Sequence, residues 1–302
     1  MNPLTDVNTM DQLKASRATL QAARPWFDLL RSRMGYRFPR LGPVFFKCFY
    51  AAVRKRCTVE LFPCIFTEAN FDDLTHRATY WQGTRFEYPT AQVLCAWAAH
   101  PQYKSFFDIG ANYGFFSYLM TSRFPQQAHA FDPSPVNYQQ LVRAKSQNGL
   151  AGLHPHHLGL SDKEEILPLH LGVQDQGHST FVSHPGMTNA AVSNCRVVRF
   201  DNWISEQHDL SPLPVSPHWI AKIDVEGYEL KVLRGMEESL RRRRFIGLVL
   251  ELNPYTLSLA GTGQNEISAF LASCGYRYYK ETHAGQRFPL HRAPNGFFVP
   301  ED

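Results

Sequence analysis

The sequence lacks any long hydrophobic run, and this absence excludes several classes of protein. None of the apolar stretches in its 302 residues approaches the roughly 20 residues that a membrane-spanning helix needs. The longest, residues 245–250, has the length of a strand. Residues 1–20 contain no continuous apolar stretch of the kind found in a signal peptide. We therefore expect a soluble, cytoplasmic protein without a transmembrane segment.

Paired cysteines and charge are also scarce. The six Cys are scattered without a Cys-x-x-Cys pair, which argues against a disulfide framework and a zinc site. The charged fraction is only 19% and the net charge is +4, so nothing demands a nucleic-acid partner. By contrast, 44% of the residues are hydrophobic, enough for one large core. The oligomeric state has no signature in the sequence.

A glycine-containing turn stands between a predicted strand and a predicted helix at residues 108–114. Glycine lets the backbone approach a ligand closely, and an acid at the strand end can hold a positively charged or hydroxyl-bearing group. The acid, amide and glycine positions of the turn are Asp108, Gly110, Asn112 and Gly114. This pattern resembles the first motif of the S-adenosylmethionine (SAM) methyltransferases. It lacks the third glycine of the dinucleotide fingerprint, which argues against an NAD-dependent sugar oxidoreductase, the main alternative on a similar sheet.

From about residue 101 onward, predicted strands alternate with predicted helices. The helix that begins at Pro135 has Ser134 as its N-cap and ends at Gly149. The predicted strands are 106–109, 128–132, 156–160, 219–224 and 245–252, followed by a closing antiparallel hairpin of 276–281 and 296–299. Further helices are predicted over 228–242 and 267–274. Such alternation favours an α/β fold with a doubly wound, mostly parallel, Rossmann-like sheet. The resemblance of the glycine turn to the SAM methyltransferases implies the seven-stranded fold of those enzymes.

Two regions fall outside this alternation. Residues 1–75 are predicted to form a helical N-terminal extension or cap, which leaves 76–302 as the methyltransferase domain. Within that domain, residues 165–200 combine β-like segments with a polar, glycine-containing stretch. We interpret them as a β-rich insertion with one or two extra strands.

Acids follow several of the predicted strands. Asp132 lies roughly 20 residues beyond the glycine turn, where a carboxylate can accept hydrogen bonds from both ribose hydroxyls of an adenosine. Ser161 and Asp162 follow the third strand, where an adenine amino group needs an acceptor. Asp224 and Glu226 follow the fourth strand. Because ligands bind beyond the carboxyl ends of parallel strands, these acids predict one shared site.

The segment 222–235 reads Lys-Ile-Asp-Val-Glu-Gly-Tyr-Glu-Leu-Lys-Val-Leu-Arg-Gly and resembles the signature of the FkbM-type SAM-dependent methyltransferases. The turn at 108–117 resembles the first motif of that family, and Tyr80-Trp81-x-Gly83 with Glu87 resembles its lead-in segment. The resemblance spans roughly 75–300. It implies SAM as cofactor and methylation of a hydroxyl on a small molecule or carbohydrate. The predicted cofactor contacts are Glu87, Asp108, Gly110, Asn112, Gly114, Asp132, Ser161, Asp162 and Asp224.

A hydroxyl acceptor needs a group that takes its proton as the new bond to carbon forms. Asp224 is the first candidate for this catalytic role, and Glu226 and Glu251 are the next. If Asp224 instead holds the amino group of SAM, the base is Glu226 or a loop histidine such as His178. Asp224 and Glu251, with Asn253, also match loosely the magnesium ligands of catechol-type O-methyltransferases. We expect hydrogen bonding around the cofactor there, and no metal.

Two further patterns suggest other functions only weakly. Asn253-Pro254-Tyr255 resembles half of the Asn-Pro-Pro-Tyr motif of DNA amino-methyltransferases, but the second proline is missing and the tripeptide follows the fifth strand. His154 and His156 share a strand face without an apparent acid or cysteine partner, so a half-exposed strand is the simpler interpretation. A relative that binds SAM without catalysis is a third possibility.

Overall fold

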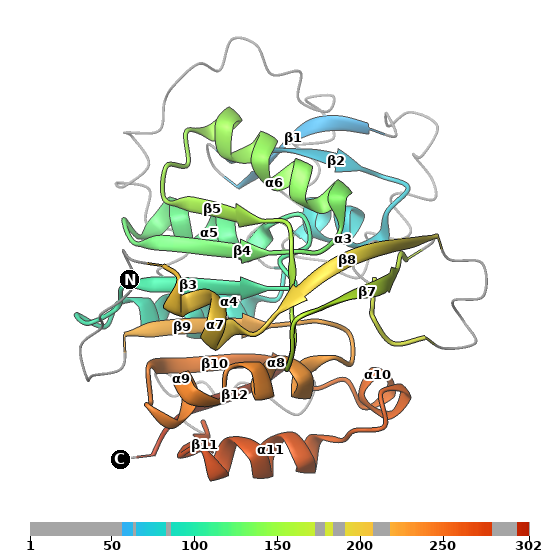
Figure 1. The fold of residues 1–302 in the computed structure, drawn as a ribbon. Coiled ribbons are helices and arrows are strands. Elements are labelled where there is room, and N and C mark those ends of the chain that lie inside the picture. Colours follow the sequence, from blue (N-terminus) through green and yellow to red (C-terminus); the bar gives the residue numbers. More distant parts are fainter. Residues whose placement is uncertain are drawn as a thin grey trace.

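A seven-stranded sheet forms the centre of the computed structural model (Figure 1). The structure describes residues 56–62, 65–82, 86–172, 179–183, 191–207, 218–279 and 295–301. From one edge to the other the strands are β11 (Tyr276–Tyr278), β12 (Asn295–Pro300), β10 (Phe245–Glu251), β9 (Trp219–Ile223), β3 (Ser105–Ile109), β4 (Gln127–Phe131) and β5 (Leu153–His156). Only β12 runs antiparallel to its neighbours. The predicted mostly parallel sheet and its closing hairpin are confirmed.

The order of the strands reverses between β3 and β9. From β3 the chain adds β4 and then β5 on one side, whereas β9 pairs with the opposite edge of β3 and is followed outward by β10. Such a reversal opens a crevice at the carboxyl ends of the two central strands. The residues that follow β3, β4 and β9 therefore lie around this one crevice.

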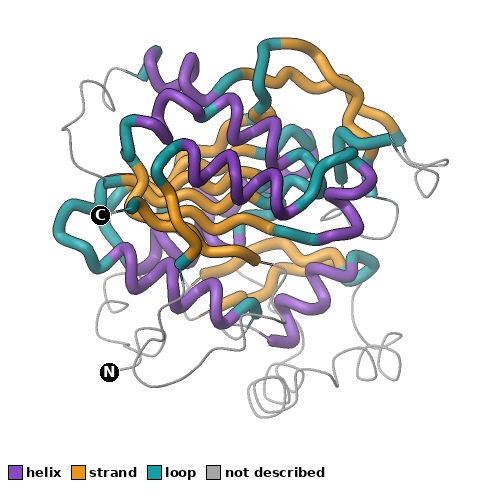
Figure 2. The backbone as a smooth tube through the Cα atoms, turned by 90° about the horizontal axis from the view of Figure 1, so that it is seen from below, coloured by secondary structure: helices purple, strands orange, loops and turns teal. Residues whose placement is uncertain are grey.

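Helices cover both faces of the sheet (Figure 2). The core is divided into two layers of side chains, one on each face. Phe106 belongs to the layer under α4 (Tyr88–Ala98), α5 (Phe115–Arg123) and α6 (Pro135–Asn148), whereas Phe107 belongs to the opposite layer. The opposite layer is covered by α7 (Phe200–Ser205), α8 (Glu229–Gly235), α9 (Glu237–Arg241), α10 (Pro254–Leu259) and α11 (Gln264–Ser273). Since strands buried on both faces alternate with a period of two, consecutive apolar residues serve both layers.

Helix α6 follows the predicted signals closely. Ser134 Oγ accepts a hydrogen bond from Asn137 N at 3.5 Å, Pro135 begins the helix, and Gly149 ends it with a φ of 64°. The predicted helix over 228–242, however, is two helices, α8 and α9, that meet at Met236. The break follows Gly235, where a Cβ would stand 1.9 Å from the carbonyl oxygen of Ser161. Glycine is a poor helix former, and here the chain outside the helix packs directly against it.

The predicted third strand over 156–160 is wrong in its position. The strand of the main sheet is β5, and the chain leaves that sheet after His156. Gly159 and Leu160 form β6, which pairs with β8 (Val192–Val198) in a separate sheet completed by β7 (Glu165–His170). The two short runs differ because Leu153 packs in the layer under α6, whereas Leu160 packs in the opposite layer. Strands β7 and β8 of this small sheet lie within residues 165–200.

The predicted helical extension over 1–75 is not confirmed. Residues 1–55 lie outside the described part of the chain. The next residues form an antiparallel hairpin of β1 (Arg56–Phe62) and β2 (Ile65–Asn70), followed by α3 (Leu74–Gln82). Alternate residues of β2 are buried, and Phe66 exchanges two hydrogen bonds with the side chain of Asn148 at the end of α6. Burial of every second residue, with backbone hydrogen bonds to a neighbouring side chain, is typical of a strand and not of a helix.

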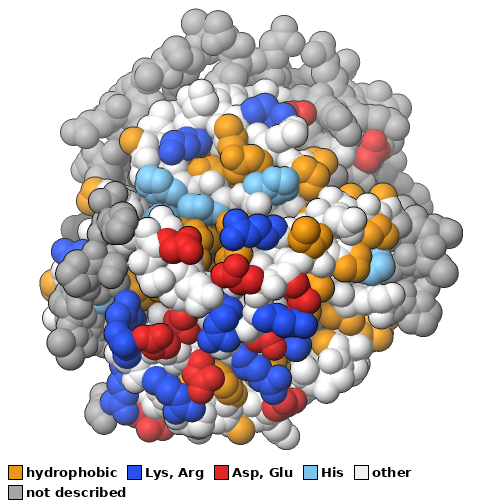
Figure 3. Space-filling model, viewed as in Figure 1, with side chains coloured by type: hydrophobic (Ala, Val, Ile, Leu, Met, Phe, Trp, Pro, Cys, Tyr) orange, Lys and Arg blue, Asp and Glu red, His pale blue; other side chains and the backbone are white. Residues whose placement is uncertain are grey.

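Two of the arginines near the end of α9 take part in local ion pairs. Arg241 pairs with Glu237 at 2.8 Å and Arg242 pairs with Glu238 at 2.5 Å, each four residues apart. Basic and acidic side chains alternate over the lower half of the face in Figure 3 and form no continuous basic patch there. None of the helices in the described ranges combines the length and the apolar character that crossing a membrane would require.

Candidate functional site

Two cavities adjoin the turn that follows β3. The first, which we call the β4 cavity, is lined by Ile109, Gly110, Asn112, Phe131, Asp132, Pro133, Asn137, Gly159, Leu160, Leu169, Ser179, Thr180, Phe181, Asp224, Val225 and Tyr228. The second, the acidic cavity, is lined by Thr75, Phe86, Glu87, Asp108, Gly110, Ala111, Asn112, Tyr113, Phe115, Phe116, Lys222, Asp224, Glu226 and Glu251. Gly110, Asn112 and Asp224 line both cavities, so the two are neighbouring parts of one site at the reversal of strand order.

Close packing of the backbone explains the glycines of the turn. Gly110 has a φ of 79°, and a Cβ on it would lie 1.8 Å from the carbonyl oxygen of Asp224. Gly114 has a φ of 97°, and a Cβ there would lie 2.5 Å from Leu141 Cδ2. Asn112 also has a positive φ, 51°, which asparagine tolerates better than most residues. The turn is therefore held tightly against β9 and α6, with its open side toward the two cavities.

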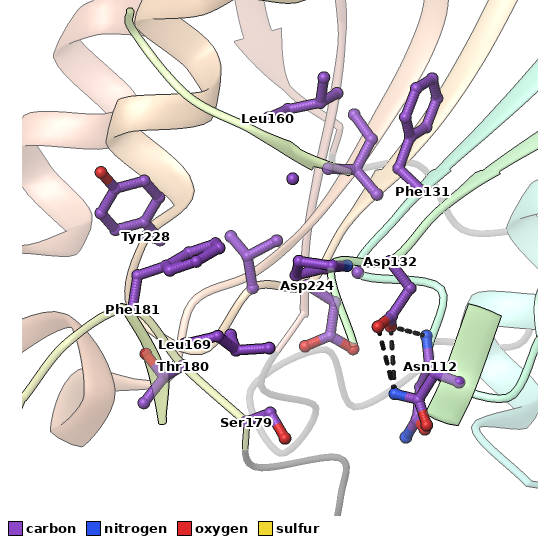
Figure 4. Close-up of a pocket in the computed structure, with 16 residues that line it drawn as sticks. Asn112, Phe131, Asp132, Leu160, Leu169, Ser179, Thr180, Phe181, Asp224 and Tyr228 are labelled. Carbon is purple, nitrogen blue, oxygen red and sulfur yellow. Dashed lines mark hydrogen bonds between the residues drawn. The ribbon is translucent and has the colours of Figure 1, made fainter. Parts of the chain in front are cut away.

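Asp132 forms one wall of the β4 cavity (Figure 4). Its Oδ1 accepts a hydrogen bond from Ser134 N at 2.9 Å, and its Oδ2 accepts one from Asn112 N at 2.7 Å. The side-chain amide of Asn137 donates to both oxygens at 3.3 Å. Burial raises the pKa of Asp132 to about 7, although these hydrogen bonds favour the ionised form. A carboxylate has about four acceptor positions, so a ligand hydroxyl would have to share or displace the two long Asn137 contacts.

The opposite wall of the β4 cavity is aromatic. Phe181 and Tyr228 lie together there, their ring centroids 5.4 Å apart, while Asp132 and Asn112 lie on the other side with Asp224 between (Figure 4). Leu160 and Leu169 add apolar surface from β6 and β7. A flat apolar ligand with hydroxyl groups at one edge fits such a lining.

Asp108 has a structural role as well as a place in the acidic cavity. Its Oδ2 accepts hydrogen bonds from the amide and the hydroxyl of Ser117 at 3.0 and 2.6 Å. These bonds tie the end of β3 to the first turn of α5. Burial raises the pKa of Asp108, and the nearby Lys222 opposes that shift.

The acidic cavity is also lined by a lysine, Lys222, which faces several of the acids. Asp108 and Lys222 occupy paired positions on β3 and β9, so both project from the same face of the sheet. The Lys222 side chain is buried, its Nζ donates to Asp224 Oδ2 at 2.6 Å, and the same nitrogen lies 5.0 Å from the centroid of the Phe116 ring. Burial alone would lower the pKa of Lys222, but Asp224, Glu87 and Asp108 raise it. The lysine therefore stays charged and holds one oxygen of Asp224.

Three carboxylates converge at the other end of the acidic cavity. Asp224, Glu226 and Glu251 each place an oxygen within 4.8 Å of the others. Burial, followed by repulsion from Asp224 and Glu226, raises the pKa of Glu251 to about 10, so Glu251 is protonated at neutral pH. Its Oε2 has no hydrogen-bond partner within the described ranges. Such a group can hold a divalent cation, or it can share protons and surround a cationic ligand.

Asn253 does not complete this cluster. Its side chain instead caps α10 by accepting a hydrogen bond from Tyr255 N at 3.1 Å. The third residue beside Asp224 and Glu251 is Glu226, not Asn253 as the loose match to the magnesium ligands suggested. The Asn253-Pro254-Tyr255 tripeptide is thus the start of a helix, and neither cavity is lined by it.

Glu87, predicted from the lead-in segment, does reach the acidic cavity. It precedes α4 with a φ of 43°, and its Oε2 accepts a hydrogen bond from Asn295 Nδ2 at 2.9 Å. Burial raises the pKa of Glu87, while Lys222 opposes the shift. The bond to β12 fixes this side chain across the cavity from β9.

Ser161 and Asp162 line neither cavity. Asp162 forms an ion pair with Lys231 at 3.0 Å, and its Oδ1 accepts a hydrogen bond from Ser161 Oγ at 3.2 Å. They follow β6 of the small sheet, not the third strand of the main sheet, which explains the displacement. His178 lies outside the described residues. His154 and His156 stack with His129 on β4, and neither of them lines either of the two cavities.

The site also contains residues to which sequence reasoning gave no role. Thr180 and Phe181 come from the glycine-containing stretch of the insertion, which has no recognisable motif. Asn137 stands in a helix that was recognised by its caps, and Tyr228 lies in the 222–235 segment without an assigned role. Lys222 is also part of that segment, but its ion pair with Asp224 could not be predicted, because the sequence does not show that the Lys222 side chain is buried.

In doubly wound sheets, ligands commonly bind at the reversal point of strand order, which is where these two acid-bearing cavities lie. The family model for the methyltransferase FkbM domain matches residues 108–278, more than half of the chain. The chain therefore belongs to the FkbM methyltransferase family, as the resemblance of its two motifs implied.

Two curated relatives come from fungi. The chain is 27% identical over 148 residues to Methyltransferase 1 of Beauveria bassiana (strain ARSEF 2860), a match that covers 43% of this chain and 57% of the relative. It is 30% identical over 154 residues to Methyltransferase sdnD of Sordaria araneosa, covering 43% of this chain and 60% of the relative. The matches thus span somewhat more than half the length of these relatives.

Similarity to solved structures is more distant. A methyltransferase FkbM from Methylobacillus flagellatus KT aligns with a TM-score of 0.40 and 15% identity, covering 66% of this chain and 44% of that one. The TYW2 protein of M. jannaschii, solved in complex with AdoMet, aligns with a TM-score of 0.38 and 11% identity, covering 83% of this chain and 92% of that one.

Proposed function

We propose that this protein is a SAM-dependent O-methyltransferase that acts on a hydroxyl group of a small molecule or a carbohydrate. The observation that carries the proposal is the shared turn at 108–114. On one side of it lies an apolar cavity with a buried acid at its wall, and on the other lies a cavity with several acids. Adenosine suits the first cavity, and the cationic end of SAM suits the second.

The residues present fit the parts of SAM. Asp132 would accept hydrogen bonds from the ribose hydroxyls, and Leu160, Phe181 and Tyr228 would contact the adenine. Gly110 lines both cavities, so a ligand that lies along it would extend from one into the other. Acids near Asp224 complement the ammonium and sulfonium charges. Ser161 and Asp162 are omitted from the proposed contacts because they line neither cavity.

When bound, SAM would supply an electrophilic methyl group for an in-line displacement. The protein then has to orient the acceptor and take up its proton. We assign the uptake of the acceptor's hydroxyl proton to Asp224. Lys222 donates to its Oδ2, so Oδ1 would face the acceptor hydroxyl. Glu226 is the second candidate. Glu251 has a pKa of about 10, so it would donate a hydrogen bond within the acid cluster before it could act as a base.

Transfer of labelled methyl from SAM to a panel of alcohols and oligosaccharides tests this function. We expect Asp224→Ala to abolish turnover, since a general base contributes about 10²–10⁴-fold to the rate. Glu266→Gln is the matched control, because Glu266 is a half-exposed acid that pairs with Arg234 on the surface. A near-normal rate in Asp224→Ala would remove Asp224 from the reaction. Parallel calorimetry with SAM and NAD distinguishes the proposal from an oxidoreductase.

Metal dependence is tested in the same assay. We expect transfer to survive exhaustive chelation, because Lys222 already offsets part of the negative charge and Glu251 carries a proton at neutral pH. A loss of activity with EDTA that Mg²⁺ restores would show that the three carboxylates of the acid cluster act as ligands.

A further inference from the structure

Thr180 connects the insertion to the loop that carries Glu226. It lies in the short segment 179–183 between β7 and β8, and it is 4% exposed. Its backbone exchanges two hydrogen bonds with His170 of β7, at 2.9 and 3.0 Å. Thr180 is therefore anchored to the small sheet by its main chain, and its side chain is directed elsewhere.

The hydroxyl of Thr180 reaches the backbone of the acid loop. Thr180 Oγ1 donates to the carbonyl oxygen of Glu226 at 2.9 Å, across 46 positions of sequence, and it accepts from Val182 N at 3.0 Å. Both hydrogen-bonding functions of the hydroxyl are thus used. A buried hydroxyl with a donor and an acceptor partner has one orientation, and it specifies where the two segments meet.

Glu226 needs such support because its backbone is unusual. It has a φ of 52° and is followed by Gly227 with a φ of 99°. A left-handed conformation is unfavourable for a residue with a side chain, so surrounding contacts must maintain it. Glu229 Oε1 accepts hydrogen bonds from Val225 N and Gly227 N at 3.1 and 3.2 Å. The loop is therefore held at its amides by α8 and at a carbonyl by the insertion.

The same contact lies at the boundary between the two cavities. Thr180 and its neighbour Phe181 line the β4 cavity (Figure 4). Glu226 lines the acidic cavity. A ligand that packs against Phe181 therefore packs against a segment bonded directly to the Glu226 loop. The position of the Glu226 carboxylate and the wall of the β4 cavity are linked through one side-chain oxygen.

We propose that Thr180 is a positioning residue whose hydroxyl holds the Glu226 loop so that the Glu226 carboxylate stays beside Asp224 at the methyl-donor end of the site. This inference rests on the proposed function. Thr180 acts only through Glu226 and contacts no reacting atom.

The test uses two ligands and needs no knowledge of the acceptor. S-adenosylhomocysteine (SAH) lacks the transferable methyl group, whereas sinefungin carries an ammonium group at that position. Their relative affinities, measured by calorimetry, report on the acids at the methyl-donor end. We expect Thr180→Val to bind SAH within about threefold of the wild type and to bind sinefungin about tenfold more weakly, a loss near 1.4 kcal/mol. Thr180→Ser keeps the hydroxyl and should retain both affinities.

A double-mutant cycle separates positioning from general damage to the fold. Glu226→Gln should lose a similar part of the sinefungin preference, and adding Thr180→Val to it should change that preference less than twofold, about 0.4 kcal/mol. Thr180→Ala replaces Thr180→Val if the valine variant does not fold. If Thr180→Val had the same ratio of the two affinities as the wild type, or if Thr180→Ser lost as much of the sinefungin preference as Thr180→Val, the role of Thr180 would be overturned and the proposed function would not be affected. A wild-type protein that binds neither ligand would overturn the proposed function as well.

Discussion

At the scale of single residues, Asp132 combines nearly complete burial with a place in the wall of the β4 cavity. Its position after the second strand could be predicted from sequence, because the chain order of strand and acid is visible. Its titration could not, because the raised pKa comes from burial by residues distant in sequence. This acid therefore gives the proposed cofactor site a pH dependence.

We expect the affinity for SAH to rise between pH 6 and pH 8. The pKa of Asp132 is about 7, so the carboxyl is mostly protonated at the lower pH and mostly ionised at the higher one, where it accepts stronger hydrogen bonds from ribose hydroxyls. Asp132→Asn should cost about 1.5–3 kcal/mol of binding at pH 8 and less at pH 6. Calorimetry at both values measures this difference. Equal affinity of the two proteins at pH 8 would exclude Asp132 as the ribose contact.

At the scale of elements, the unit from β3 through the turn to α5 depends on the close approach of Gly110 to β9. We expect Gly110→Ala to lower the free energy of unfolding by about 2–5 kcal/mol, since the new methyl group both overlaps the Asp224 carbonyl and disfavours a φ of 79°. Gly149→Ala is the matched control, because Gly149 has a φ of 64° but nothing within 4 Å of a Cβ. It should cost only about 1 kcal/mol.

Urea denaturation of the two glycine variants measures both costs. Similar losses in the two would mean that backbone conformation alone requires Gly110, and that its packing against β9 contributes little. SAH binding by whatever fraction of Gly110→Ala remains folded then shows whether the turn still has the shape of the site.

Elements with a local signal could be predicted well, and elements defined by distant packing could not. The caps of α6 and the strand before Gly110 are encoded in adjacent residues, and both are confirmed. The split between β5 and β6 was missed because Leu153 and Leu160 differ only in the layer that each joins. The hairpin of β1 and β2 was missed because its docking partner, Asn148, lies more than 80 positions away.

At the scale of the whole molecule, the family and the main sheet follow from two motifs, but the completed site does not. The 108–117 and 222–235 segments could be joined in advance because both stand at strand ends beside the reversal point. Thr180 and Phe181 enter the site only because the small sheet folds back over it. The insertion contains neither of the two motifs, so its contribution to the site could be identified only from the three-dimensional structure.

The most direct test of this account is a crystal structure of the protein with SAH at saturating concentration. We predict that the adenosyl group occupies the β4 cavity, with the ribose hydroxyls within hydrogen-bonding distance of Asp132 and the amino-acid end passing Gly110 toward Asp224. A β4 cavity that stays empty, or a ribose directed away from Asp132, would contradict the proposed cofactor site and the function built on it.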